Sequence, residues 1–157
     1  MDWLFWVPLI TASLHIIEEF VFPGHFSEWY VQYKPDIKKS VSKRFLIIIN
    51  VLLLILCYDV IALRTSQIGI FLWLVVMALL AANGVWHLKG VIKTRSYSPG
   101  VVTGILLYLP LAIYGYVFFL QSKQASILTA LIAFVIGASY QFWSNIFHRF
   151  RVRITKA

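Results

Sequence analysis

The sequence has few charges and almost no cysteine. Only 13% of its 157 residues are charged, whereas 61% are hydrophobic and the mean hydropathy is +0.82. A soluble domain of this size could not hide that much apolar surface, which excludes a soluble globular protein and predicts an integral membrane protein. The single cysteine, Cys57, excludes an internal disulfide.

The sequence also has no glycine-rich loop of the kind that binds nucleotides, and no internal repeat. Its formal net charge of +8 would suit a nucleic-acid partner, but the basic residues lie between apolar runs. In a membrane protein this distribution sets the orientation of the chain. We therefore expect the lipid bilayer as a partner and no nucleic acid.

Five apolar segments are long enough to cross a bilayer, which takes about 20 residues. They predict an all-α bundle of about five transmembrane helices, in a single domain that covers residues 1–157. The predicted spans are 3–22, 45–63, 68–88, 100–120 and 125–147. The first does not resemble a signal peptide, because Asp2 replaces the basic start and no small-residue cleavage site follows the apolar run.

The basic residues alternate between the two sides of this predicted bundle. Twelve of the 14 lie between the first two spans, between the third and fourth, or after the fifth. The other two, Arg64 and Lys123, lie in the intervening loops. Because cytoplasmic loops carry an excess of Lys and Arg, we expect the N-terminus outside and the C-terminus in the cytoplasm, in the inner membrane of the cell.

Residues 13–20, SLHIIEEF, place an imidazole and two carboxylates in the first span. Glu18 and Glu19 follow His15 by three and four residues, so they flank it on one broad helix face that can point at a shared target. Ionisable groups at membrane depth are costly and are functional candidates by default. Both glutamates lie within about one turn of the predicted cytoplasmic end, and snorkelling to the headgroup layer is the alternative explanation.

Two further spans that end at the same predicted boundary also carry polar residues there. The third ends with Asn83 and His87, four residues apart on one helix face. The fifth ends with Asn145 and His148, and Tyr97 precedes the fourth. Each histidine alone is equally well explained by a helix cap or a lipid phosphate contact. The convergence of three helices on one layer is what predicts a shared site.

Three motifs in this layer resemble those of the HXXEE family of small bacterial membrane proteins. They are HIIEE at 15–19, NGVWH at 83–87 and YSPG at 97–100, in the family's order over the first two-thirds of the chain. The resemblance implies a multi-span membrane protein and supplies no reaction. It groups six polar residues: His15, Glu18, Glu19, Asn83, His87 and Tyr97.

Three functions fit this pattern. The first is a metal-dependent membrane enzyme, a hydrolase or an oxidase acting on a lipid or other amphiphile, because histidine and carboxylate ligands suit zinc or iron. The second is a proton- or cation-coupled transporter or binding protein, because such residues mark ion paths. The third is a metal-free polar network that fixes helix packing. The one-sided gathering of polar groups and the lack of repeat symmetry favour the enzyme over the transporter.

For the enzyme, each polar residue has an expected role. The expected metal ligands are His15, Glu19, His87 and His148. The expected catalytic residues are Glu18, Glu19 and Tyr97. Two amides would orient the ligands by hydrogen bonds: Asn83 and Asn145. We also expect the YSPG turn to pack against the ends of the first and third spans, with its tyrosine hydroxyl facing His87 or Glu19.

Overall fold

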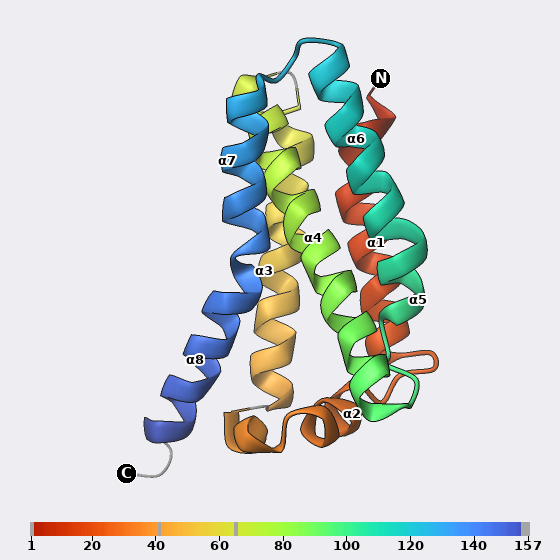
Figure 1. The fold of residues 1–157 in the computed structure, drawn as a ribbon, viewed down its shortest axis with the longest axis vertical. Coiled ribbons are helices and arrows are strands. Elements are labelled where there is room, and N and C mark those ends of the chain that lie inside the picture. The colour runs from red at the N-terminus through yellow and green to blue at the C-terminus, as the bar shows by residue number, and fades with distance from the viewer. Residues whose placement is uncertain (1, 41, 65, 155–157) are drawn as a thin grey trace.

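The computed structural model describes residues 2–40, 42–64 and 66–154, and within them it contains helices and turns but no strand (Figure 1). The all-α prediction is therefore confirmed. The elements in chain order are α1 (Trp3–Phe20), α2 (Phe26–Tyr33), the 3₁₀ helix η1 (Pro35–Ser40), α3 (Lys43–Ala62), α4 (Gln67–Thr94), α5 (Val101–Thr103), the π-helical turn η2 (Gly104–Tyr108), α6 (Leu109–Gln121), α7 (Ile127–Ala138) and α8 (Tyr140–Ile154).

Four helical segments of the described chain are long and apolar enough to cross a membrane. They are Arg44–Ala62, Gln67–Thr94, Val101–Gln121 and Ile127–Arg153. These segments correspond to the second to fifth predicted spans. α1, the first predicted span, forms a helix of 18 residues but is not one of the four, because its histidine and two glutamates lower its hydropathy. The predicted count of about five spans is therefore not confirmed.

Three of the predicted spans differ from the observed helices in length or regularity. The predicted end of the third, residue 88, falls inside α4, which continues to Thr94. The fourth is not a uniform α-helix, because the π-helical turn η2 precedes α6. The fifth is interrupted at Ser139, between α7 and α8, and α8 continues beyond the predicted end.

Glycines bring two neighbouring segments close to α4. A Cβ atom on Gly84 would lie 2.7 Å from the carbonyl oxygen of Gly104, so α4 and η2 pack backbone to backbone. A Cβ atom on Gly137 would lie 2.2 Å from the carbonyl oxygen of Val75, which places α7 equally tightly on α4. The helix breaks at Ser139, two residues after Gly137, and α8 then leans away from the bundle (Figure 1).

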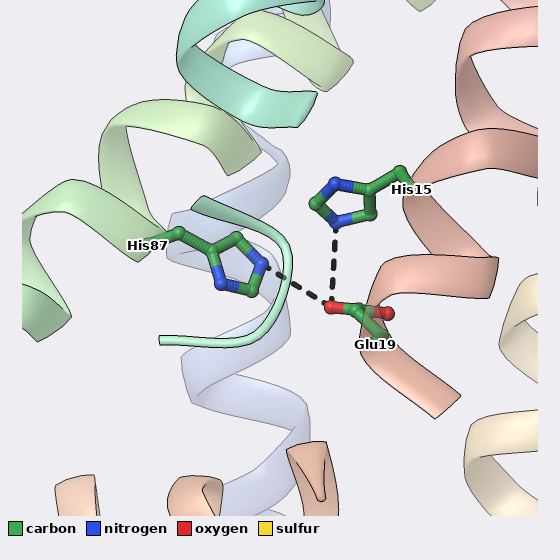
Figure 2. Close-up of side chains that lie close together, drawn as sticks. All are labelled: His15, Glu19 and His87. Atoms are coloured by element: carbon green, nitrogen blue, oxygen red, sulfur yellow. Dashed lines mark ion pairs between the residues drawn. The ribbon is translucent and has the colours of Figure 1, made fainter. Parts of the chain in front are cut away.

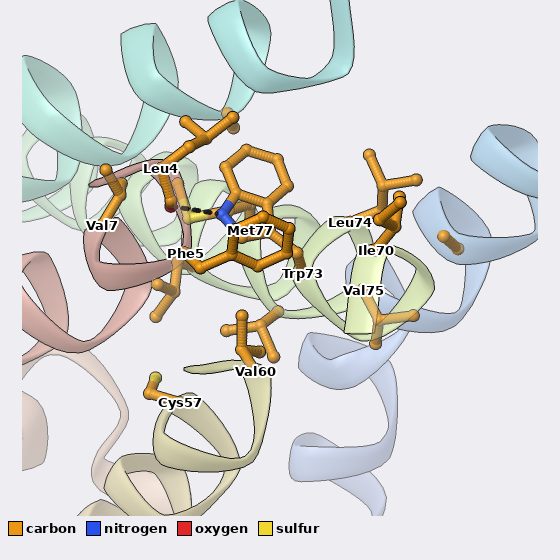
Figure 3. Close-up of a cluster of buried hydrophobic side chains, with 14 of the residues drawn as sticks. Leu4, Phe5, Val7, Cys57, Val60, Ile70, Trp73, Leu74, Val75 and Met77 are labelled. Atoms are coloured by element: carbon orange, nitrogen blue, oxygen red, sulfur yellow. Dashed lines mark hydrogen bonds between the residues drawn. The ribbon is translucent and has the colours of Figure 1, made fainter. Parts of the chain in front are cut away.

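The hydrophobic core surrounds Trp73 of α4 (Figure 3). This side chain is fully buried, and its Nε1 donates a hydrogen bond of 2.8 Å to the Leu4 carbonyl oxygen, which ties the start of α1 to α4. Met77 and the thiol of Cys57 are buried in the same cluster. The lone cysteine is therefore a core residue of the bundle.

The two ends of the bundle differ in what they carry. Figure 1 places the N-terminus and the α6–α7 connection at one end, and α2, the α4–α5 turn and the C-terminal helix at the other. Lys34 and Lys93 lie at the α2 end, where both ammonium groups sit over the Tyr33 ring, 5.9 and 5.1 Å from its centroid. The polar residues of the predicted site lie toward this same end.

Candidate metal centre

α1 and α4 bring three side chains of the predicted site together (Figure 2). The Oε1 atom of Glu19 lies 3.3 Å from Nε2 of His15 and 3.2 Å from Nε2 of His87. All three side chains are buried, and their ligand atoms lie within 4.8 Å of one another, so they could hold a metal ion. We call His15, Glu19 and His87 the metal group. The sequence predicted that the polar side chains of the first and third spans would meet at one depth, and these three side chains do meet.

The two distances from Glu19 match the edges of a tetrahedral ligand shell. Ligand atoms bound at about 2.0–2.1 Å to one zinc ion lie roughly 3.3–3.4 Å apart. Two histidine nitrogens and one carboxylate oxygen are also the protein ligands in one class of catalytic zinc sites, which keep the fourth position open. Both the geometry and the donor chemistry of the metal group therefore fit a divalent metal.

His87 is held with one ring nitrogen directed at Glu19. Its Nδ1 lies 2.9 Å from Oγ of Ser98, and Trp29 of α2 stacks on its ring with centroids 5.7 Å apart. Its Nε2 is buried and lies 3.2 Å from Oε1 of Glu19, a contact that is an ion pair when the ring is protonated. A buried nitrogen directed at a carboxylate can be satisfied by a proton or by a shared cation.

His15 is oriented by Thr103. Its Nδ1 lies 2.8 Å from Oγ1 of Thr103, and that hydroxyl donates to Oε2 of Glu18 at 2.6 Å. The Thr103 hydroxyl could also donate to the Gly100 carbonyl oxygen, but that oxygen is 3.3 Å away. The hydroxyl proton therefore lies in the shorter bond to the Glu18 carboxylate. Thr103 must then accept from Nδ1–H of His15, which leaves Nε2 of the neutral ring with its lone pair.

Asn83 lies beside this lone pair, on the ring nitrogen that a metal would use, whereas an orienting bond is made to the other ring nitrogen. Its Nδ2 is 3.1 Å from Nε2 of His15, and its Oδ1 accepts a hydrogen bond of 3.1 Å from Gln141. The Gln141 bond fixes which way the Asn83 amide faces. Asn83 thus presents an N–H, not an oxygen, to the imidazole.

Glu18 faces the start of the fourth span rather than the metal group. Its carboxylate accepts four hydrogen bonds: from the Tyr97 hydroxyl (2.5 Å), from the N–H of Val102 (3.0 Å), and from the N–H (2.8 Å) and hydroxyl of Thr103. The free N–H groups and the dipole at a helix N-terminus favour a carboxylate there. The expectation that both glutamates of the motif share one target is therefore wrong.

The YSPG turn packs against both histidines of the metal group, and its predicted position at the ends of α1 and α4 is confirmed. Gly100 has φ +97°, and a Cβ atom there would lie 2.6 Å from Cε1 of His15 and 2.9 Å from Cε1 of His87. Only glycine fits this position. The tyrosine has a different partner from the two expected, because the Tyr97 hydroxyl donates to Glu18. Burial, and secondly the Glu18 carboxylate, raise the pKa of Tyr97, so its hydroxyl stays a donor.

His148 and Asn145, the expected fourth ligand and its support, lie outside the metal group. The buried His148 ring contacts Tyr30 and Phe45, with centroid distances of 5.8 and 5.2 Å. Asn145 accepts a hydrogen bond from Lys34. Gln141, near the start of α8, still reaches Asn83 of α4. Asn145 and His148 lie further along α8, which leans away from the bundle, and their contacts are with the α2 region and with α3.

The metal group borders a large cavity. The cavity has a volume of about 730 Å³ and is lined by residues of α1, α2, α3, α4 and α8. His15, Glu19 and Asn83 form part of its wall, and most of the remaining wall is aliphatic or aromatic. A pocket of this size holds a single small ligand.

Two residues that position the site, Trp29 and Thr103, were given no site role from the sequence. Ser98 lies inside the YSPG motif and Gln141 among the polar residues of the fifth predicted span, but neither was expected to contact a site residue. A signal was available for Thr103, because a threonine in the first turn of the fourth span lies at the depth of the HIIEE motif. The role of Trp29 had no comparable signal, since aromatic residues near a membrane boundary commonly serve as interface anchors.

A known protein family matches most of the chain. The family is described as "Protein of unknown function with HXXEE motif", and its profile matches residues 6–115. This range contains the whole metal group, Glu18 and the YSPG turn. No curated protein and no solved structure matches the chain.

Proposed function

This chain belongs to the HXXEE family, and we propose that it is a metal-dependent membrane enzyme, a hydrolase or an oxidase that acts on a lipid or other amphiphile. The observation that supports this proposal is the approach of two imidazole nitrogens to one carboxylate oxygen, at 3.3 and 3.2 Å. A buried carboxylate is costly unless a cation or several donors compensate it. One divalent metal would satisfy the carboxylate and both ring nitrogens together.

Zinc or iron suits this set of donors. Such a metal supplies Lewis acidity, which polarises a substrate oxygen or lowers the pKa of water. His15 and Glu19 line the cavity, so a molecule bound there reaches the metal group directly. Glu18 and Tyr97 would support this chemistry by holding the turn that touches both histidines, because the Glu18 carboxylate is fully engaged with four donors.

We also propose that α1 crosses the membrane as a fifth span. At 18 residues it is about 27 Å long, close to the thickness of the hydrocarbon core, about 30 Å. Its three ionisable residues are buried inside the protein and do not face lipid, which reduces the cost of insertion. With this fifth span, the distribution of Lys and Arg supports a position of the α2 end, with the metal group, at the cytoplasmic face of a bacterial inner membrane.

The metal content of the purified protein tests the proposal. We expect about one zinc or iron per chain in the wild type. Glu19→Gln and His87→Ala should each lower metal affinity by about tenfold or more. Matched controls are Glu28→Gln and His25→Ala, which make the same changes at exposed positions outside the metal group and should leave the metal in place.

The other two functions predict different results in the same preparation. Protein without metal that shows proton-dependent flux in liposomes would support a transporter. Protein without metal or flux, in which Glu19→Gln only lowers thermal stability, would support a polar network that fixes packing. Unchanged metal content in Glu19→Gln and His87→Ala would remove the ligand assignment.

A further inference from the structure

The cavity beside the metal group is far larger and more apolar than a metal site requires. We infer that it binds the hydrocarbon chain of a single-chain amphiphile, which enters sideways from the membrane and places an oxygen-bearing head group at the metal group. The position of the head group rests on the proposed function. The position of the chain rests on the cavity alone.

The apolar side chains that line the cavity favour a hydrocarbon ligand. The walls include Ile49 and Leu53 of α3 and Leu79 and Leu80 of α4. An empty space of about 730 Å³ would deprive these side chains of van der Waals partners. Water needs two to four polar partners, which this part of the wall does not provide. A volume of this order encloses one ligand, so it suits one chain better than a whole two-chain lipid.

The cavity opens toward the side of the bundle. Leu52 of α3 and Trp143 of α8 both line it, yet they are 55% and 61% exposed. Both residues belong to segments apolar enough to cross a membrane, so their exposed faces meet lipid. α8, which carries Trp143, leans away from the bundle after the helix break, as Figure 1 shows.

Side chains of α3 and α8 contact each other beside the cavity. Phe45 stacks on Phe147, with ring centroids 5.8 Å apart, and the Arg151 guanidinium lies 4.0 Å from the centroid of the Phe45 ring. These contacts join the start of α3 to α8, and Phe45 and Phe147 also line the cavity. The side opening lies away from these contacts, at Leu52 and Trp143.

Part of the cavity wall is polar. A ligand with a polar head group therefore fits the cavity better than a plain hydrocarbon does. Asn50, Asn83 and Gln141 line it together with His15 and Glu19. Amide N–H groups and a metal both favour an oxygen ligand. Hydroxyl, carboxyl and phosphate head groups share this chemistry.

A photoreactive fatty acid, with a diazirine near its methyl end, tests the inference in the purified full-length protein. We expect the crosslinks to map to cavity-lining residues of α3 and α8. Leu53→Trp on α3 and Ile146→Trp on α8 fill the cavity from two sides and should each reduce labelling by about tenfold. The control is Val51→Trp, which adds the same bulk on the lipid-facing side of α3 and should leave labelling unchanged.

Two results would overturn the inference. One is crosslinks confined to the outer faces of the helices, and the other is equal labelling of all three tryptophan variants. Metal content, measured in the same samples, separates this inference from the proposed function. Metal without cavity labelling refutes the chain site alone, whereas cavity labelling without metal refutes the enzyme proposal and leaves the chain site standing.

Discussion

At the scale of single residues, the hydroxyl group of Thr103 connects the two halves of the HIIEE motif. It accepts from His15 and donates to Glu18, so Glu18 supports the metal group without belonging to it. Hydrogen bonds behind a ligating histidine fix its tautomer and raise its basicity. The two adjacent glutamates thus have separate roles, Glu19 as a candidate ligand and Glu18 as the anchor of the turn.

Replacing Thr103 tests this connection. Thr103→Val keeps the shape of the side chain but removes both hydrogen bonds, so His15 loses the partner that fixes its tautomer. We expect metal affinity to fall by about tenfold, measured by competition with a chelating dye. Thr103→Ser retains the hydroxyl and should bind like the wild type. Wild-type affinity in the valine variant would show that Thr103 does not position His15.

The Tyr97 hydroxyl should contribute to stability rather than to metal binding. Tyr97→Phe removes one donor from Glu18 and should lower the free energy of unfolding by about 1 kcal/mol, since the hydroxyl is only partly buried. Thermal unfolding in detergent measures the loss, and metal content should not change. Tyr58→Phe, at a residue that is 62% exposed, is the control. A drop in metal content without loss of stability would contradict this role.

The same variant makes a prediction about pH. The pKa of Tyr97 is raised in the folded protein, so the stabilising contribution of its hydroxyl is fully present below the ordinary tyrosine pKa of about 10 and is lost as the pH rises through the raised value. The difference in Tm between wild type and Tyr97→Phe should therefore be the same at about pH 6 and about pH 9. A difference that changes over this range would indicate that another group controls the contact.

At the scale of helices, the site depends on how closely η2 lies on α4. Gly84 and Gly104 are in backbone contact, His87 follows Gly84 by three residues, and Thr103 directly precedes Gly104. Separating the two segments would therefore move His87 away from Thr103 and from the turn that touches the histidines.

Gly84→Ala tests this contact between helices. The added methyl group has no space, and overpacking of this kind costs about 1–3 kcal/mol. We expect a lower Tm in detergent together with weaker metal binding, because the displaced segments carry residues of the site. A variant with the Tm and metal affinity of the wild type would show that the two backbones can separate without disturbing the site.

Most of the helices could be predicted from the sequence, whereas their irregularities could not. Apolar length predicts a helix, and i to i+4 spacing predicts that His15 and Glu19 share a face. The π-helical turn η2 precedes Pro110, which lacks an N–H, but the sequence does not show how the helix accommodates it. The break at Ser139 follows Gly137, where α7 packs tightly on α4, and His148 lies beyond this break, outside the metal group.

Helical spacing also could not decide which way Glu18 points. Residues three and four positions after His15 are equally near it, so the motif alone suggests one shared target. The direction is set by four donors around the YSPG turn, which lies about 80 residues further along the chain. Contacts of this kind depend on tertiary packing, which a short motif does not contain.

At the scale of the whole molecule, the number of crossings determines where the termini lie. Five crossings put the two termini on opposite sides of the membrane, whereas four put them on the same side. We expect a fusion after Ala157 to a reporter that matures only in the cytoplasm to be active. An external reporter at the N-terminus should also be active. Both termini on the cytoplasmic side would show that α1 does not cross, and a silent C-terminal fusion would invert the orientation.

X-ray absorption at the edge of the bound metal, in purified wild-type protein, tests the metal group most directly. We predict a first shell of nitrogen and oxygen atoms at about 2.0–2.1 Å with the outer-shell signature of two imidazoles, which His87→Ala reduces to one imidazole and His25→Ala leaves unchanged. A protein purified without metal, or a spectrum with no imidazole contribution, would contradict the assignment of His15, Glu19 and His87 as a metal site.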